Sequence, residues 1–109
     1  MDVVIHRFDI WLVSLDPTKG SEIAKTRPCL VVSPDEVNRR LNTVLIAPMT
    51  STRKLYPTRI NTHFAGQDGQ IALDQLRSVD KTRLVKRLGS LDDSVCQEVC
   101  QTLVALFVY

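Results

Sequence analysis

The chain has 109 residues and a formal net charge of +2, with 44% hydrophobic and 24% charged residues. This is the composition of one ordinary folded domain, and it argues against intrinsic disorder. No apolar run approaches the ~20 residues of a membrane-spanning helix, and no signal-peptide pattern opens the sequence. We therefore expect one domain over residues 1–109, in the cytoplasm and without membrane contact.

Strand patterns dominate the first half of the sequence. Alternating or continuous apolar residues of strand length occupy three segments: residues 9–15 (DIWLVSL), 29–33 (CLVVS) and 43–49 (TVLIAPM). The two continuous runs predict strands buried on both faces. Between them, SPDEVNRRLN predicts a short helical turn, with Ser33 as its cap and Pro34 at the first helical position. Trp11 stands in the middle of a strand, so we expect it in the core or at a dimer interface.

The second half predicts further strands and one helix. Three strands are expected, at residues 57–64 (PTRINTHF), 70–79 (QIALDQLRSV) and 83–91 (RLVKRLGSL), the second of them after a turn at GQDGQ. Its alternation slips near Gln75, which indicates a bulge, and Gly89 interrupts the third. Apolar residues recur every three or four positions in residues 91–107, which predicts an amphipathic helix with Asp92 as N-cap.

These elements predict a mainly β fold of the α+β class. Five to seven short strands followed by one helix favour a strongly bent antiparallel sheet or small barrel, with the helix over an open side. The three cysteines, Cys29, Cys96 and Cys100, have no metal-site spacing, and we expect them reduced, with the last two on one helix face. Only two histidines occur, His6 and His63, which gives weak support for an acid–base pair.

The connection between the first two strands is long and charged. It runs over residues 16–26, whereas small domains usually join strands with about two to six residues. Lysine and arginine also outnumber acidic residues in segments 19–59 and 77–87. A shared basic face for a polyanion is one interpretation, and an ordinary solvated surface is the other.

Polar residues gather where the predicted strands end. The set comprises Glu22, Lys25, Thr26, Arg27, Thr50, Ser51, Thr52, Asp74 and Gln75. An arginine beside hydroxyl groups suits a phosphate, because the guanidinium offers a planar fork of donors. The structural alternatives are a surface ion pair between Arg27 and Glu22, a turn at Thr50, and backbone hydrogen bonds to Asp74.

The stretches DIWLVSLDPTKGSEIAKTRPCLVVSP, NTVLIAPMTS and GQIALDQLRSVD, in this order and spacing, resemble the MazF/PemK (Kid) family of toxin endoribonucleases. The resemblance covers nearly the full chain. It implies an SH3-like barrel, a homodimer, and sequence-specific cleavage of single-stranded RNA, including mRNA, without a metal or other cofactor. It also implies 2′,3′-cyclic phosphate and 5′-hydroxyl ends, growth inhibition, and neutralisation by a labile antitoxin.

Carried over by position, the resemblance places the catalytic groups at Arg27, Thr50 and Glu22. We expect Glu22 as base and Arg27 as charge stabiliser and proton donor. The expected substrate-binding residues are Lys19, Lys25, Thr26, Ser51, Thr52, Arg53, Lys54, Asp74, Gln75 and Arg77. Ala72 and Ser21 stand where the PemK branch has an arginine and a histidine, so the sequence follows the MazF pattern.

Two other function classes remain alternatives at this point. One is a non-catalytic toxin on the same scaffold, like the gyrase-poisoning toxins that share the fold. The other is a barrel that binds RNA or protein without forming a product. An arginine and a threonine retained together at the predicted site favour the enzyme, because a pure binder has no need of that pair.

Overall fold

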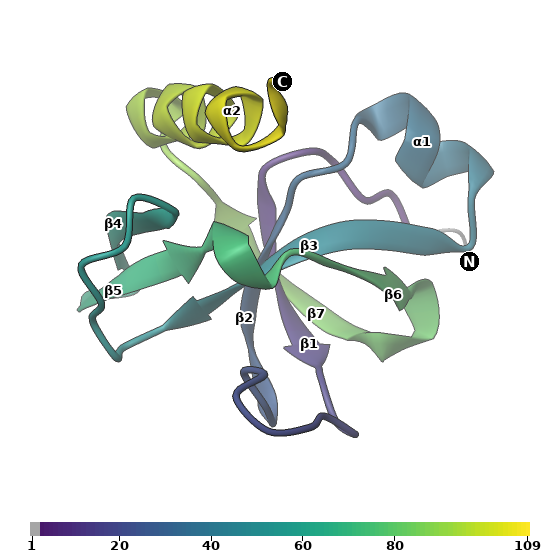
Figure 1. Cartoon of the computed structure of the whole chain (residues 1–109). Coiled ribbons are helices and arrows are strands. Elements are labelled where there is room, and N and C mark those ends of the chain that lie inside the picture. Colours follow the sequence, from purple (N-terminus) through teal and green to yellow (C-terminus); the bar gives the residue numbers. More distant parts are fainter. Residues whose placement is uncertain (1–2) are drawn as a thin grey trace.

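The computed structural model describes residues 3–109, and within them the chain forms one strongly curled antiparallel sheet crossed by a C-terminal helix (Figure 1). The strands are β1 (Asp9–Ser14), β2 (Thr26–Val31), β3 (Thr43–Thr50), β4 (Arg59–Phe64), β5 (Gln67–Ala72), β6 (Arg77–Asp80) and β7 (Leu84–Ser90). Their order is β4-β5-β3-β2-β1-β7, and β6 also pairs with β3. The predicted bent sheet with a terminal helix is therefore confirmed.

Four helical segments complete the described chain. They are α1 (Asp35–Arg40), the 3₁₀ turns η1 (Leu73–Gln75) and η2 (Lys81–Arg83), and α2 (Asp93–Phe107). No helix within residues 3–109 is long and apolar enough to cross a membrane.

The alternation of side chains along the central strands builds two hydrophobic clusters, one on each face of the sheet. Trp11 and Val13 of β1 belong to the first cluster, and Ile10 belongs to the second. Trp11 is buried, so the prediction of a core position is confirmed. Burial on both faces holds for most of β3, but Leu45 is exposed.

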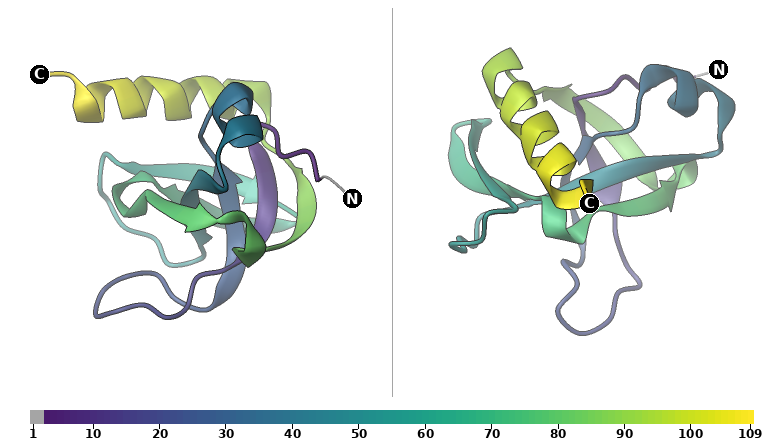
Figure 2. Two further views of the ribbon diagram at one scale, coloured as in Figure 1. Left: turned by 90° about the vertical axis from the view of Figure 1, so that its right-hand side faces the viewer. Right: turned by 45° about the horizontal axis from the view of Figure 1, so that its top comes forward.

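Helix α2 covers the second cluster with its buried residue Val99, and the partly buried Val95 and Leu103 pack against the same cluster. It lies across the β4 side of the sheet, and its C-terminal end projects past the strands (Figure 2). Asp92 occupies the predicted N-cap position, although its side chain makes no capping hydrogen bond. The cysteines are free, as expected, and burial raises the pKa of the Cys29 thiol to about 12.

The prediction for the start of α1 was wrong. Pro34 holds the N-cap position, and no side chain caps the helix. The Ser33 hydroxyl instead donates to the Asn38 side-chain oxygen and accepts from the Leu45 amide at 3.1 Å. Asn38 is buried and needs hydrogen-bond partners there, so Ser33 ties the helix to β3.

The predicted single strand over residues 70–79 is in fact two strands with the 3₁₀ turn η1 between them, and no bulge. Strand β5 pairs with the end of β3 at Met49 and Thr50, whereas β6 pairs with its beginning, at Thr43 to Ile46. The turn η1 is the corner at which the chain changes from one pairing to the other. This corner puts Asp74 and Gln75 between the two loops that carry the candidate site.

The predicted turn at GQDGQ was also misplaced. The hairpin between β4 and β5 turns at Ala65 and Gly66, which both have positive φ, and the GQDGQ residues after Gly66 belong to β5. Two consecutive positive φ angles are what the tightest hairpin turns require, and glycine meets that requirement without strain. The third strand is not interrupted either, because β7 continues through Gly89.

Candidate active site

Arg27 and Thr50 come together in one open cavity of about 180 Å³, although 22 intervening residues separate them in the sequence. Strand β2 contributes Arg27 to the lining of this cavity, the end of β3 contributes Thr50 with Ser51 beside it, and β5 contributes residues 68–70. Strands β2 and β3 pair in an antiparallel manner. This pairing of the strands brings Arg27 and Thr50 to the same cavity.

Arg27 carries a positive charge without a carboxylate partner. Among the ion pairs of residues 3–109, none involves Arg27. Its Nε donates to the carbonyl oxygen of Ala24 at 2.7 Å, and the side chain is half-buried. The alternative of a surface ion pair with Glu22 is therefore wrong. A guanidinium has five N–H donors, and the hydrogen bond to Ala24 uses only the one on Nε.

Thr50 ends β3, where it pairs with Gln70 of β5. Its hydroxyl oxygen accepts a hydrogen bond from the Thr52 amide at 3.2 Å, so the hydroxyl also closes the turn that follows the strand. A Cβ at Gly69 would lie 2.8 Å from the Thr50 carbonyl oxygen, closer than real Cβ contacts allow. Gly69 is therefore needed for this close approach. Sequence reasoning took this glycine for part of a turn and missed its role.

Glu22 does not share the cavity of Arg27 and Thr50. It lines a separate hollow of about 400 Å³, between the β1–β2 loop (residues 15–25) and η1. One carboxylate oxygen accepts from the Lys19 amide at 2.5 Å, which closes a small turn at the loop tip. In this position of the loop, Glu22 is not beside the predicted catalytic pair.

Asp74 is engaged in a structural ion pair that sequence reasoning missed. Its carboxylate accepts from Arg59 Nε at 2.7 Å and Nη2 at 3.1 Å, and from the Thr58 hydroxyl at 3.0 Å. The Arg59 hydrogen bonds hold the pKa of Asp74 below its usual value, so it stays ionised at neutral pH. The Arg59 side chain is only 7% exposed, and the Tyr56 ring lies against it. The alternation of PTRINTHF placed Arg59 on a polar face, but nothing in it indicated its partner.

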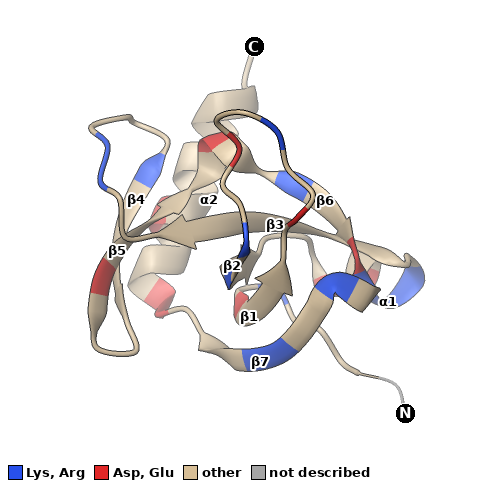
Figure 3. Ribbon diagram, turned by 90° about the horizontal axis from the view of Figure 1, so that it is seen from below, with Lys and Arg blue, Asp and Glu red and all other residues tan. Residues whose placement is uncertain are grey.

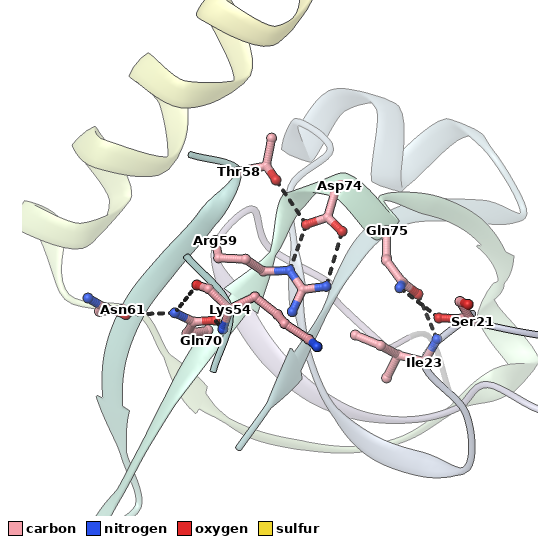
Figure 4. A network of polar contacts seen from close by, with 9 residues as sticks. All are labelled: Ser21, Ile23, Lys54, Thr58, Arg59, Asn61, Gln70, Asp74 and Gln75. Atoms are coloured by element: carbon pink, nitrogen blue, oxygen red, sulfur yellow. Dashed lines mark hydrogen bonds and ion pairs between the residues drawn. The ribbon is translucent and has the colours of Figure 1, made fainter. Parts of the chain in front are cut away.

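Gln70 and Gln75 each clamp a loop through the two ends of the side-chain amide (Figure 4). Gln70 is buried, accepts from the Lys54 amide at 3.0 Å and donates to the Lys54 carbonyl at 3.1 Å. It also donates to the Asn61 side chain. Gln75 accepts from the Ile23 amide at 2.6 Å and donates to the Ser21 carbonyl at 3.0 Å. The first clamp fixes the β3–β4 loop (residues 51–58), and the second fixes the β1–β2 loop.

The predicted substrate-binding residues do not line one groove. Arg53 lies 3.8 Å from Asp68, which also accepts from His63, whereas Arg77 donates to the Leu15 carbonyl at 3.1 Å. The remaining members, Lys19, Lys25, Thr26, Ser51, Thr52 and Lys54, are exposed on the two loops or at their ends. Figure 3 shows basic segments in both loops, and acidic segments beside the basic ones in the β1–β2 loop, where Asp16 and Glu22 stand.

The chain matches the family of PemK-like, MazF-like toxins of type II toxin–antitoxin systems over residues 6–107. It belongs to this family. The toxin is also 30% identical over 109 residues to endoribonuclease EndoA of Bacillus subtilis (strain 168), which covers 93% of this chain and 92% of the relative. The resemblance drawn from the sequence motifs is thereby confirmed.

Solved structures of MazF proteins have the same fold as this toxin. MazF (Form-I) from Deinococcus radiodurans superposes with a TM-score of 0.86, at 28% identity, over 99% of this chain and 100% of that chain. A MazE–MazF structure (Form-II) from the same organism reaches a TM-score of 0.78 at 30% identity, over 96% of both chains. The likeness therefore extends over the whole fold.

Proposed function

We propose that this MazF-like toxin cuts single-stranded RNA by attack of a ribose 2′-hydroxyl on the adjacent phosphate. The observation that carries the proposal is the cavity lined by both Thr50 and Arg27, whose guanidinium has no carboxylate partner among residues 3–109. RNA brings its own nucleophile, so the protein needs only to move protons and to stabilise charge. The products are a 2′,3′-cyclic phosphate and a 5′-hydroxyl, and endoribonuclease is also the activity that the name of the B. subtilis relative states.

Arg27 and Thr50 stabilise the negative charge that develops on the phosphorane. Donors aimed at developing charge contribute on the order of 3 kcal/mol each in enzymes. In this scheme Arg27 also supplies a proton to the 5′ oxygen. Asp74 is not the base in this scheme, because its carboxylate already accepts from Arg59 and Thr58.

Glu22 takes the proton of the 2′-hydroxyl in this scheme, which requires the tip of the β1–β2 loop to move. In the observed position Glu22 lies in a separate hollow and accepts from the Lys19 amide. A swing of residues 17–22 toward the cavity upon RNA binding brings the carboxylate to the substrate. The movement breaks the hydrogen bond from Gln75 to the Ser21 carbonyl, whereas Glu22 itself is exposed and its hydrogen bonds go only to Lys19.

Cleavage of a long RNA in the presence of EDTA tests the function directly. We expect discrete cuts with cyclic phosphate and 5′-hydroxyl ends, no loss of activity in EDTA, and cuts at one short sequence. Uncut RNA that nevertheless binds would favour the RNA-binding barrel. Growth inhibition without RNA cutting would favour a non-catalytic toxin of the gyrase-poisoning kind.

The second partner in this proposal is an acidic, disordered antitoxin segment that competes with RNA in the cytoplasm. The D. radiodurans relative is described in a MazE–MazF structure. Basic side chains of Lys25, Arg27, Arg53 and Lys54 lie around the loops that flank the cavity. RNA and antitoxin should displace each other in titrations, and Arg53→Ala and Lys54→Ala should weaken both. Simultaneous binding of both partners would contradict the shared surface.

A homodimer is part of the same proposal. The last turn of α2 and the residues after it expose Val104, Phe107, Val108 and Tyr109, at 66% or more of their surface. A contiguous apolar patch of this kind on a small domain marks an interaction surface, and a symmetric pair of such ends covers both. Sedimentation at micromolar concentration should show a dimer, and a monomer would contradict the proposal.

A further inference from the structure

Gln75 is tied to the β1–β2 loop by both ends of its side-chain amide. Its Oε1 accepts from the Ile23 amide at 2.6 Å, and its Nε2 donates to the Ser21 carbonyl at 3.0 Å. Gln75 ends the 3₁₀ turn η1, which follows the buried end of β5. The bonded residues are more than 50 positions apart in the sequence, and the bonds connect a corner of the sheet to a surface loop.

The residues directly after Ile23 are fixed one by one. The Ile23 side chain packs on the first hydrophobic cluster. The Ala24 carbonyl accepts from Arg27 Nε at 2.7 Å, and the Lys25 amide donates to the Asp16 carboxylate at 3.2 Å. The Ala24 carbonyl is therefore the group that aims the Arg27 side chain, and its own position depends on the peptide held at Ile23.

We propose that Gln75 is a positioning residue, which orients the Arg27 guanidinium through the backbone of Ile23 and Ala24. The proposal rests on the function proposed above, in which Arg27 is the catalytic group. Gln75 then acts on the reaction without touching RNA, whereas the sequence pattern placed it among the substrate-binding residues. Loss of the clamp frees the Ala24 carbonyl, and an Arg27 side chain that samples several positions stabilises the phosphorane less well.

The two hydrogen bonds of Gln75 have different roles. The bond to the Ile23 amide fixes the segment that aims Arg27, and in this proposal it persists when the tip moves, because Ile23 lies outside residues 17–22. The bond to the Ser21 carbonyl holds the tip, and it breaks when residues 17–22 move to bring Glu22 to the cavity. Gln75→Glu separates the two, because a carboxylate accepts from Ile23 but cannot donate to Ser21.

Gln70 offers a matched control for Gln75. It makes the same two-ended clamp, but on the Lys54 amide and carbonyl of the β3–β4 loop. Gln70→Leu and Gln75→Leu are the same chemical change at two positions of the chain. Of the two, only Gln75 is hydrogen-bonded to the β1–β2 loop, whose Ala24 carbonyl accepts from Arg27.

The first test measures hydrogen exchange by NMR in ¹⁵N-labelled toxin, with the Arg27 Nε–H signal assigned from its loss in Arg27→Lys. In Gln75→Leu we expect the Ile23 amide and the Arg27 Nε–H to exchange at least about tenfold faster than in the wild type. Gln75→Glu should keep both slow. Gln70→Leu should speed exchange at the Lys54 amide alone. If Gln75→Leu fails to fold, Gln75→Asn, which is too short to reach the loop, takes its place.

The second test measures kcat and KM on a short RNA that contains the cleaved sequence. We expect kcat to fall about tenfold in Gln75→Leu with KM changed less than about twofold, and Gln75→Glu to restore most of kcat. An unchanged Arg27 Nε–H signal in Gln75→Leu, or no rescue by glutamate, would overturn the proposal. Wild-type toxin that cuts no RNA would overturn the proposed function, and the exchange data would still decide whether Gln75 holds Arg27.

Discussion

An arginine beside a threonine hydroxyl occurs at two places in this toxin, and the two places have opposite character. At the cavity, Arg27 lies with Thr50 and has no carboxylate partner within residues 3–109. At the corner of the sheet, Arg59 lies with Thr58, and Asp74 accepts hydrogen bonds from both. In the proposed function the first pair of donors binds an anion, whereas the added carboxylate makes the second pair a structural clamp.

The difference follows from how deeply each guanidinium is buried and therefore how much solvation its charge loses. The Arg59 side chain is almost fully buried, and a buried charge without a partner costs several kcal/mol. Arg27 is only half-buried and opens onto the cavity, so water can solvate it until a phosphate replaces the water. A residue that waits for an anionic ligand needs this partial exposure, and the comparison predicts different outcomes when the two sites are mutated.

Arg27→Ala should have the largest effect on the reaction. We expect kcat to fall about 10²–10³-fold, the range seen when one charge-stabilising donor is removed from an enzyme site. The fold should be retained, because no buried carboxylate loses its partner. Arg59→Ala is the matched control and should lower the free energy of unfolding instead. Near-normal RNA cleavage by Arg27→Ala would remove Arg27 from the mechanism.

Thr50→Ala should reduce kcat by about tenfold, because a neutral hydroxyl stabilises developing charge less than a guanidinium does. Thr58→Ala removes the equivalent hydroxyl at the corner and should leave kcat within about twofold of the wild type. Cleavage rates of the two variants on the same RNA measure the contrast. Equal losses in both would show that the two sites are not distinct in function.

Gly69→Ala should cause a smaller, several-fold loss of kcat. The added Cβ would lie 2.8 Å from the Thr50 carbonyl, so the strand that carries Thr50 must shift. Gly89→Ala is the comparison variant, and its Cβ would meet the Phe64 ring at 3.2 Å. Although Phe64 also lines the cavity, a side-chain ring shifts more easily than the Thr50 backbone, so a smaller loss is expected. A Gly69→Ala variant with full activity would show that the Thr50 position tolerates this shift.

Asp74→Asn should leave the chemistry almost unchanged and lower the free energy of unfolding by about 1–2 kcal/mol at pH 7. Arg59 holds the pKa of Asp74 below the ordinary value of 3.8, so the folded state binds this proton more weakly than the unfolded state. The stabilisation is therefore complete above that value and is lost as the pH falls below it. Urea unfolding at pH 7 and pH 3 should show the gap between wild type and variant closing in acid, and a constant gap would contradict this account.

Much of this toxin was determined by local sequence. The alternation in DIWLVSL predicted β1, the apolar recurrence over residues 91–107 predicted α2, and the order of three motifs identified the family. Arg27 and Thr50 were predicted as catalytic from short motifs through the family resemblance, and this assignment stays a prediction. Such features can be predicted from the sequence, since each depends on residues that lie within a few positions of one another.

Other features were decided only by the tertiary structure. Asp74 meets Arg59 from 15 residues away, and Gln75 meets Ile23 from 52 residues away. No local sequence pattern predicts either contact. Both depend on the turn η1, which connects β5 to β6 where the chain passes from one end of β3 to the other. The hollow that separates Glu22 from Arg27 arises in the same way. Local sequence fixes which residues can act, whereas the pairing of distant strands decides which of them meet.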